Sequence, residues 1–167
     1  DDQAYLVSTH PRQDSLDFTA AYAHFALAPS VLEAFDVPQI DVADASIYPD
    51  SGYVVIQINA EMDPLEHSKI LADRFTKLHN FYETTVRIRG KYRYTAHGMY
   101  DYIDEEESTW PIAFESIAPD TAGITLGRAI IDETDDFYIS PYFAYRGKVE
   151  LHADQLPMFF MGSILIQ

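Results

Sequence analysis

The sequence RIRGKYRYTAHG, residues 87–98, alternates basic with mostly apolar side chains, a pattern typical of a β-strand. The basic residues are Arg87, Arg89, Lys91 and Arg93. The positions between and beside them hold Val86, Ile88, Gly90, Tyr92, Tyr94 and Ala96. Successive side chains of a strand point to opposite faces, so one face would be buried and the other would carry the four cations. We therefore predict a strand over 84–96, with Val86, Ile88 and Tyr92 buried.

The chain beyond this strand reads as further strands separated by turn residues. We predict strands over 99–104, 111–117, 123–131, 136–145, 147–152 and 157–166. Turn chemistry is present at His97-Gly98, at Pro119-Asp120, over 132–136 and at Gly147. A hairpin loop at His97–Met99 would place Lys91 opposite Glu105.

The N-terminal half favours helices around one strand. In the main helix, about 64–80, Asp63 and Pro64 form a start signal and Leu71, Phe75, Leu78 and Tyr82 make one stripe. We also predict a helix over 15–28, a short one from 30 to 33, and a strand over 53–60. The resulting fold class is α+β in a single domain, 1–167. It is a mostly antiparallel sheet or partial barrel, with one main amphipathic helix packed on it and a helical N-terminal segment.

Composition narrows the classes of function. The 167 residues include 27 acidic and 11 basic side chains, a formal charge of −16. Such a charge repels phosphate backbones, so we expect no double-stranded nucleic acid as a partner. Without cysteine there is no disulfide, no thiolate zinc site and no cysteine nucleophile. The longest apolar run, at the C-terminal end, is about half of what a spanning helix needs, so we expect a soluble, acidic protein that does not bind a membrane.

Motifs for catalysis, cofactors and metals are weak. Gly123 and Gly127 lack the third glycine or the lysine of a phosphate loop, and the histidines do not fall at converging ligand spacings. We expect no cofactor and no catalytic residue, and enzyme activity is less favoured than its absence. Asp132, Asp135 and Asp136 make a weak calcium candidate in a short acidic loop.

The basic face of residues 87–93 carries the functional hypothesis. We predict that Arg87, Arg89, Lys91 and Arg93 bind an acidic protein surface, from a partner or from another copy, in a non-enzymatic interaction or assembly domain. Simple pairing of these cations with acids on neighbouring strands is an alternative, as is binding of a small anion or single-stranded nucleic acid. The other class left open is a small-molecule-binding or catalytic β-rich domain with an aromatic-lined pocket.

Overall fold

The structure, a computed structural model that describes residues 3–166, consists of β-strands with one short 3-10 helix. The N-terminal part holds β1 (Ala4–Val7), η1 (Pro11–Gln13), β2 (Asp17–Ala20), β3 (Tyr22–Ala26), β4 (Val31–Phe35), β5 (Ile40–Val42), β6 (Ala45–Tyr48) and β7 (Val54–Ile56). The remainder holds β8 (Leu65–Ala72), β9 (His79–Gly90), β10 (Arg93–Ile103), β11 (Thr109–Pro119), β12 (Thr125–Ile131), β13 (Tyr138–Ser140), β14 (Phe143–His152) and β15 (Phe159–Ile166). The prediction of an α+β fold is therefore wrong.

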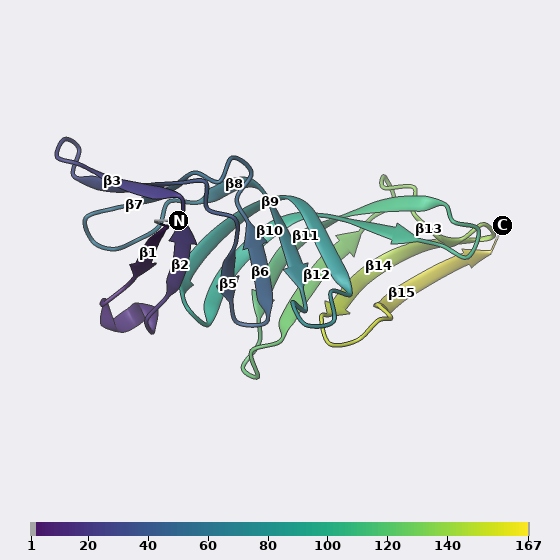
Figure 1. Ribbon diagram of the computed structural model, residues 1–167. Helices are drawn as coiled ribbons and strands as arrows, with labels where there is room; N and C mark the ends of the chain where they lie inside the picture. Colours follow the sequence, from purple (N-terminus) through teal and green to yellow (C-terminus); the bar gives the residue numbers. More distant parts are fainter. Residues whose placement is uncertain (1–2, 167) are drawn as a thin grey trace.

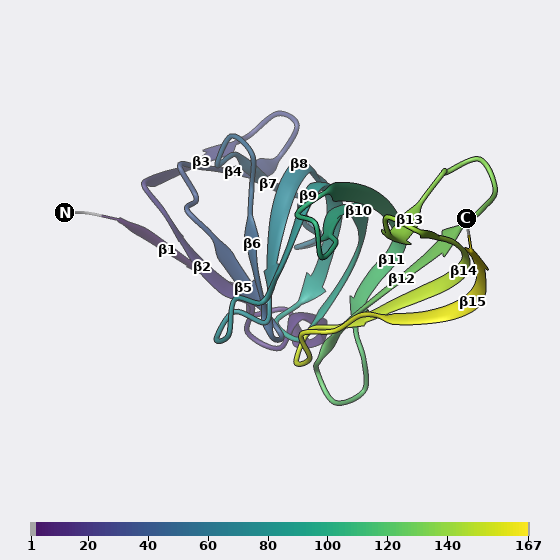
Figure 2. The same ribbon diagram turned by 90° about the vertical axis from the view of Figure 1, so that its right-hand side faces the viewer.

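Most strands belong to one antiparallel sheet of ten strands. Its order is β13-β14-β12-β11-β10-β9-β8-β6-β5, and β15 pairs with β14. Two small sheets, β1-β2 and β3-β4-β7, precede it. In Figures 1 and 2 these small sheets lie at one end of the molecule, and β14 and β15 lie at the other.

The predicted helix over 64–80 is replaced by β8, a turn and the start of β9. Ser68, Ile70 and Ala72 are buried and Lys69 is exposed, which is strand alternation. Phe75 is 76% exposed in the turn, so the helical stripe has no common buried face. Most of a helix's stability comes from packing one face against the rest of the protein. Pairing of β8 with both β6 and β9 outweighs the local start signal.

Three other local predictions fail, and a fourth element is shorter than predicted. The expected N-terminal helix over 15–28 is β2 and β3, and the short helix from 30 to 33 is β4, which pairs with β3 as a hairpin. The strand over 53–60 shortens to β7. The expected loop at His97–Met99 lies inside β10, as a bulge where the register with both neighbours shifts.

The buried hydrophobic residues form one cluster that joins the long sheet to both small sheets, through residues such as Phe18 on β2 and Val54 on β7. A polar link crosses this core. The Thr125 amide on β12 donates to Asp44 Oδ2 at 2.8 Å and its hydroxyl to Oδ1 at 2.5 Å, while Tyr94 Oη lies 2.6 Å from the same hydroxyl. Because Asp44 is in the β5–β6 turn, these bonds hold that hairpin against β10 and β12. Burial raises the pKa of Asp44.

Candidate binding site

The β9–β10 hairpin gathers three of the predicted arginines on one exposed face. The chain reverses at Lys91-Tyr92, so the basic stretch is shared by two strands rather than lying on one. Arg87 is opposite Thr95, and Arg93 is opposite Gly90. Arg87, Arg89 and Arg93 are exposed, while Val86 and Ile88 are buried as predicted. Tyr92 is in the turn and 59% exposed, so its predicted burial is wrong.

The short helix η1 packs against this hairpin and adds a fourth arginine, Arg12. Arg93 Nη2 donates a hydrogen bond to the Arg12 carbonyl oxygen, and the Lys91 amide donates to the Gln13 carbonyl oxygen at 3.0 Å. A side chain at Gly90 would lie 3.0 Å from Gln13 Cα, so glycine permits this close approach. These contacts position Arg12 beside the arginines of the hairpin.

The four arginines Arg12, Arg87, Arg89 and Arg93, here called the arginine cluster, line a cleft of about 650 Å³. Other lining residues include His10, Gln57, Asn59, Glu61 and Asp63. The Asp63 carboxylate is already hydrogen-bonded within the cleft wall, because Gln57 Nε2 donates to its two oxygens at 2.9 and 3.1 Å. The cleft thus combines four guanidinium groups with two carboxylates.

The arginine cluster differs from the other arginines in its pairing. The remaining three each have a carboxylate partner: Arg74 with Asp41 at 3.6 Å, Arg128 with Glu150 at 3.5 Å and Arg146 with Glu133 at 2.9 Å. Within residues 3–166, no guanidinium nitrogen of the arginine cluster lies within 4.0 Å of a carboxylate oxygen. The predicted alternative, neutralisation by acids on neighbouring strands, is therefore not seen in the described residues for Arg87, Arg89 and Arg93, whereas Lys91 pairs with Asp17.

Lys91, the fourth predicted binding residue, lies apart from this cleft. Its ammonium group is 3.1 Å from Asp17 Oδ1, and Tyr5 Oη donates to Asp17 Oδ2 at 2.9 Å. Hydrogen bonds from Tyr5 and Lys91 lower the pKa of Asp17, and the Asp17 hydrogen bond raises the pKa of Lys91. Lys91 and Glu105 do not face each other as predicted. Lys91 is in the turn before β10 and Glu105 is in the turn after it, so the whole length of β10 separates them.

An apolar groove of about 580 Å³ adjoins the cleft and shares His10, Gln13, Asn59 and Met62 with it. Its apolar lining includes Leu6, Val7, Leu16, Phe18, Leu32, Ile56 and Ile58. Ile58 is 83% exposed and Val7 is 51% exposed at its rim. A ligand that filled both hollows would need acidic and apolar groups side by side.

The aromatic residues mainly pack on one another. Tyr102, Phe137, Tyr145 and Phe160 form one group of ring contacts, and Phe81, Tyr100 and Phe114 form another. Tyr94 is 2% exposed and hydrogen-bonded to Thr125, so it is not free to stack on a base. At these positions the rings fill the core.

The acidic loop Asp132–Asp136 is held by its own hydrogen bonds. Asp132 Oδ1 accepts from the amide and hydroxyl of Thr134, and Asp135 Oδ2 accepts from the Asp132 amide at 2.7 Å. The Thr134 hydroxyl lowers the pKa of Asp132. In the described part of the chain, no group of three or more His, Asp or Glu side chains is placed to hold a metal ion. The calcium candidate stays a prediction without a converging ligand set.

Comparisons with protein-family models, curated proteins and solved structures find no match to this chain. Among residues 3–166 there is no helix with the length and hydrophobicity to cross a membrane. The candidate site therefore rests on the arginine cluster. Sequence reasoning found three of its members from strand alternation, but missed Arg12, which no local pattern connects with residues 87–93.

Proposed function

We propose that this chain is a non-enzymatic assembly domain whose arginine cluster binds an acidic surface of a second copy. The observation that carries the proposal is the contrast in pairing: four arginines share one cleft without a carboxylate partner among the described residues, whereas the other three arginines are paired. Unpaired guanidinium groups attract carboxylates and fit them through two parallel hydrogen bonds. A chain of formal charge −16 offers many carboxylates for that purpose.

The turn between β10 and β11 is the acidic surface best suited to the cleft. Asp104 Oδ1 accepts from the amides of Glu106 and Ser108, both at 2.9 Å, and Oδ2 accepts from the Trp110 indole at 3.0 Å. The Trp110 hydrogen bond lowers the pKa of Asp104, so this carboxylate stays ionised and anchors the turn. Glu105, Glu106 and Glu107 are exposed on it.

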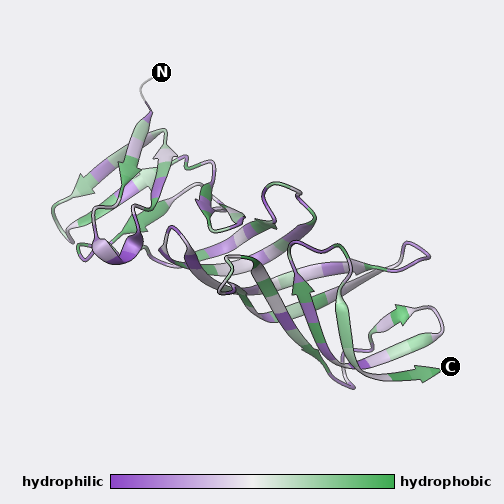
Figure 3. Ribbon diagram, turned by 90° about the horizontal axis from the view of Figure 1, so that it is seen from below, coloured by the Kyte–Doolittle hydropathy of each residue, from purple (hydrophilic) through white to green (hydrophobic). Residues whose placement is uncertain are grey.

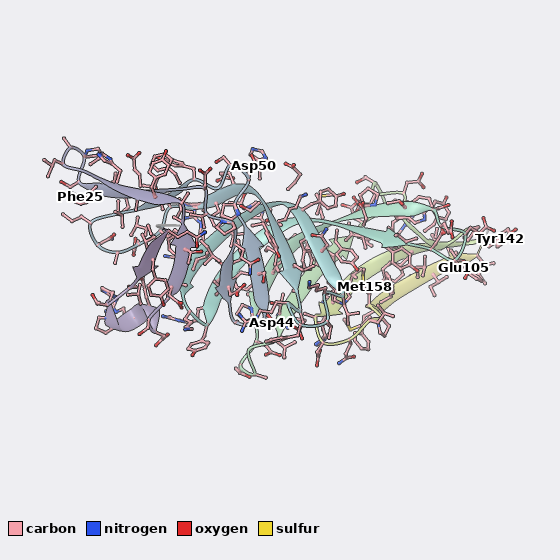
Figure 4. The ribbon with its side chains drawn as sticks, in the orientation of Figure 1. Phe25, Asp44, Asp50, Glu105, Tyr142 and Met158 are labelled. Atoms are coloured by element: carbon pink, nitrogen blue, oxygen red, sulfur yellow. The ribbon has the colours of Figure 1, made fainter. Side chains whose placement is uncertain are left out.

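The position of this turn favours a head-to-tail contact. Glu105 is at the tip of the elongated molecule, near Tyr142, and η1 lies toward the opposite end (Figures 1 and 4). The exposed Ile103, 61% accessible beside the glutamates, would meet the apolar groove next to the cleft. A contact between two different surfaces repeats from copy to copy, and produces a ring if it closes or a filament if it does not.

The decisive experiment exchanges the charges of the two surfaces. One variant carries Arg87→Glu, Arg89→Glu and Arg93→Glu, and a second carries Glu105→Lys, Glu106→Lys and Glu107→Lys. Each alone should lose the head-to-tail contact because like charges meet, while an equimolar mixture should form larger assemblies through both the native and the exchanged contact. Molar mass by light scattering measures the outcome. In wild type, the head-to-tail contact should be lost in about 1 M salt, where the screening length falls to about 3 Å, so the molar mass should fall.

Three results would contradict the proposal. An arginine variant that unfolds would show that the arginines support the fold itself. A mixture whose mass does not exceed that of each variant alone, or a wild type whose mass does not change with salt, would remove the head-to-tail contact. If mass is constant but inorganic phosphate raises the melting temperature of the wild type and not of the arginine variant, the cleft binds a small anion instead.

A further inference from the structure

The last strand, β15, is long, apolar and exposed on both faces. Its sequence, FFMGSILI over Phe159–Ile166, contains no charged residue. The exposed fractions are 48% for Met161, 56% for Ile164, 44% for Leu165 and 81% for Ile166. Figure 3 shows this strand as a hydrophobic edge at the end of the molecule away from the N-terminal sheets. Within β15 only Phe160 packs well inward, with its ring 5.1 Å from that of Tyr145.

Among residues 3–166, one edge of β15 has no strand beside it. In this part of the chain β15 pairs with β14 alone, so on the other side every second residue presents its amide and carbonyl groups outward. The two ends of the strand order, β13 and β5, are three residues each, and the Ala43 amide next to β5 donates to the Lys91 carbonyl oxygen at 2.9 Å. Proteins usually shield a free edge by shortening it, charging it or covering it. In β15 the described residues contain none of these protections.

We propose that β15 pairs antiparallel with β15 of a second copy, joining the two long sheets across a two-fold axis. A two-fold axis brings the same strand from both copies together in antiparallel orientation, so one surface is complementary to itself. The absence of charge matters here, because most other surfaces of a chain with 27 acidic residues would repel their own copy. The strand supplies backbone hydrogen bonds, and Ile164, Leu165 and Ile166 supply apolar area.

The surface area of the chain is consistent with a missing partner. It exposes 9761 Å², whereas a compact monomer of 19.0 kDa exposes about 8,400 Å². The excess, roughly 1,400 Å², is larger than the roughly 800 Å² that each partner buries in a standard interface. The elongated shape accounts for some of this extra exposed area. The exposed, uncharged surface of β15 contributes to it as well.

This interface is separate from the arginine cluster, and salt distinguishes the two. Backbone pairing and apolar burial do not weaken when charges are screened, and screening reduces the repulsion between two acidic copies. The β15 dimer should therefore persist in about 1 M salt, where the head-to-tail contact is lost. It should also persist in the Arg87→Glu, Arg89→Glu, Arg93→Glu variant.

The test compares Ile164→Lys with Ile130→Lys. The two isoleucines are 56% and 57% exposed, but Ile130 is on β12, which has a neighbour on each side. Both variants add the same charge, and only the first places it at the free edge. By sedimentation in high salt, we expect wild type and Ile130→Lys to dimerise and Ile164→Lys to dissociate at least tenfold more readily. A monomeric wild type at micromolar concentration, or equal dissociation of both variants, would overturn the proposal.

Cross-linking provides a readout that does not depend on a disruptive variant. The chain contains no cysteine, so any disulfide must come from an introduced thiol. Met161→Cys, Ser163→Cys, Ile164→Cys and Leu165→Cys, each alone, scan both faces of β15, with Ile130→Cys as the control. Antiparallel pairing about a two-fold axis places one position opposite itself, so the variant nearest to the axis should form a covalent dimer far faster than the control. Equal, slow cross-linking throughout would also overturn the proposal.

Discussion

Gly162 on β15 lies directly opposite Gly147 on β14, and the Tyr145 hydroxyl is close to both. A methyl group on Gly162 would be 2.1 Å from the Arg146 carbonyl oxygen and 2.7 Å from Gly147 Cα. The Tyr145 hydroxyl donates to the Lys148 carbonyl oxygen at 2.6 Å and would be 2.8 Å from the added carbon. The two strands approach this closely because neither glycine has a side chain.

Gly162→Ala should therefore detach β15 from β14. Overpacking at such a site costs about 1 to 3 kcal/mol, and here the obstacle is backbone that has little room to move. We expect a lower free energy of unfolding and faster amide hydrogen exchange along β15. Ser163→Ala, the exposed neighbour, is the control and should leave both unchanged. Protected β15 amides in Gly162→Ala would show that the strands adjust.

Asp44→Ala should destabilise the protein by removing the link between the β5–β6 turn and β12. Asp44 is 7% exposed and accepts two hydrogen bonds from Thr125, whose amide would be left buried without a partner. The expected loss is about 2 to 3 kcal/mol in urea unfolding. Asp50→Ala is the matched control, since Asp50 is exposed (Figure 4). Equal stability of the two variants would contradict the structural role of Asp44.

The buried His79 should make stability depend on pH. Its Nδ1 is 3.0 Å from Tyr100 Oη and its Nε2 is 2.6 Å from the Gln155 carbonyl oxygen, and desolvation lowers its pKa. In the unfolded chain histidine takes up a proton near pH 6.5, at about its ordinary pKa, so below that pH the unfolded state binds more protons. The contribution of His79 is therefore complete above about pH 6.5 and is lost as the pH falls toward the folded pKa.

His79→Gln isolates this contribution. The variant should be less stable than wild type near neutral pH, and the difference should shrink at about pH 5, because wild type loses the part that depends on a neutral imidazole. Urea unfolding at the two pH values measures it. If wild type and His79→Gln differ in stability by the same amount at both pH values, His79 has the same pKa in the folded and unfolded states.

Ile88→Ala should cost about 2 to 4 kcal/mol, because Ile88 is 4% exposed on the inner face of β9. Ile58→Ala, at an isoleucine that is 83% exposed, should change stability by about 0.5 kcal/mol or less. Denaturant unfolding of both variants checks the assignment of faces. Similar losses would mean that the alternation around the arginine cluster has been assigned to the wrong faces.

Strand alternation was the part of the fold that the sequence predicted well. It placed Val86 and Ile88 inside and Arg87 and Arg89 outside. These predictions succeed because a period of two repeats within a few residues and needs no partner to be recognised. The same reasoning failed at Tyr92, because a two-residue turn begins at Lys91, where the alternation gives no signal of reversal.

The helical predictions failed because their signals are local and pairing is not. The start signal at Asp63-Pro64 and the stripe from Leu71 are compatible with a helix, but β6 and β9 lie on either side of β8 and satisfy its backbone hydrogen bonds. Which residues pair across a sheet depends on contacts between distant parts of the chain, and propensity is readily overridden by them.

The sequence by itself therefore determined a strongly acidic, β-rich chain with a patterned basic stretch and no thiol chemistry. Only the tertiary structure decided that Arg12 joins Arg87, Arg89 and Arg93 around one cleft, that Lys91 pairs with Asp17, and that β15 has a free edge. The physical reason is that composition and periodicity are properties of neighbouring residues. A cleft, an ion pair and an unpaired strand edge depend on which distant segments the fold brings together.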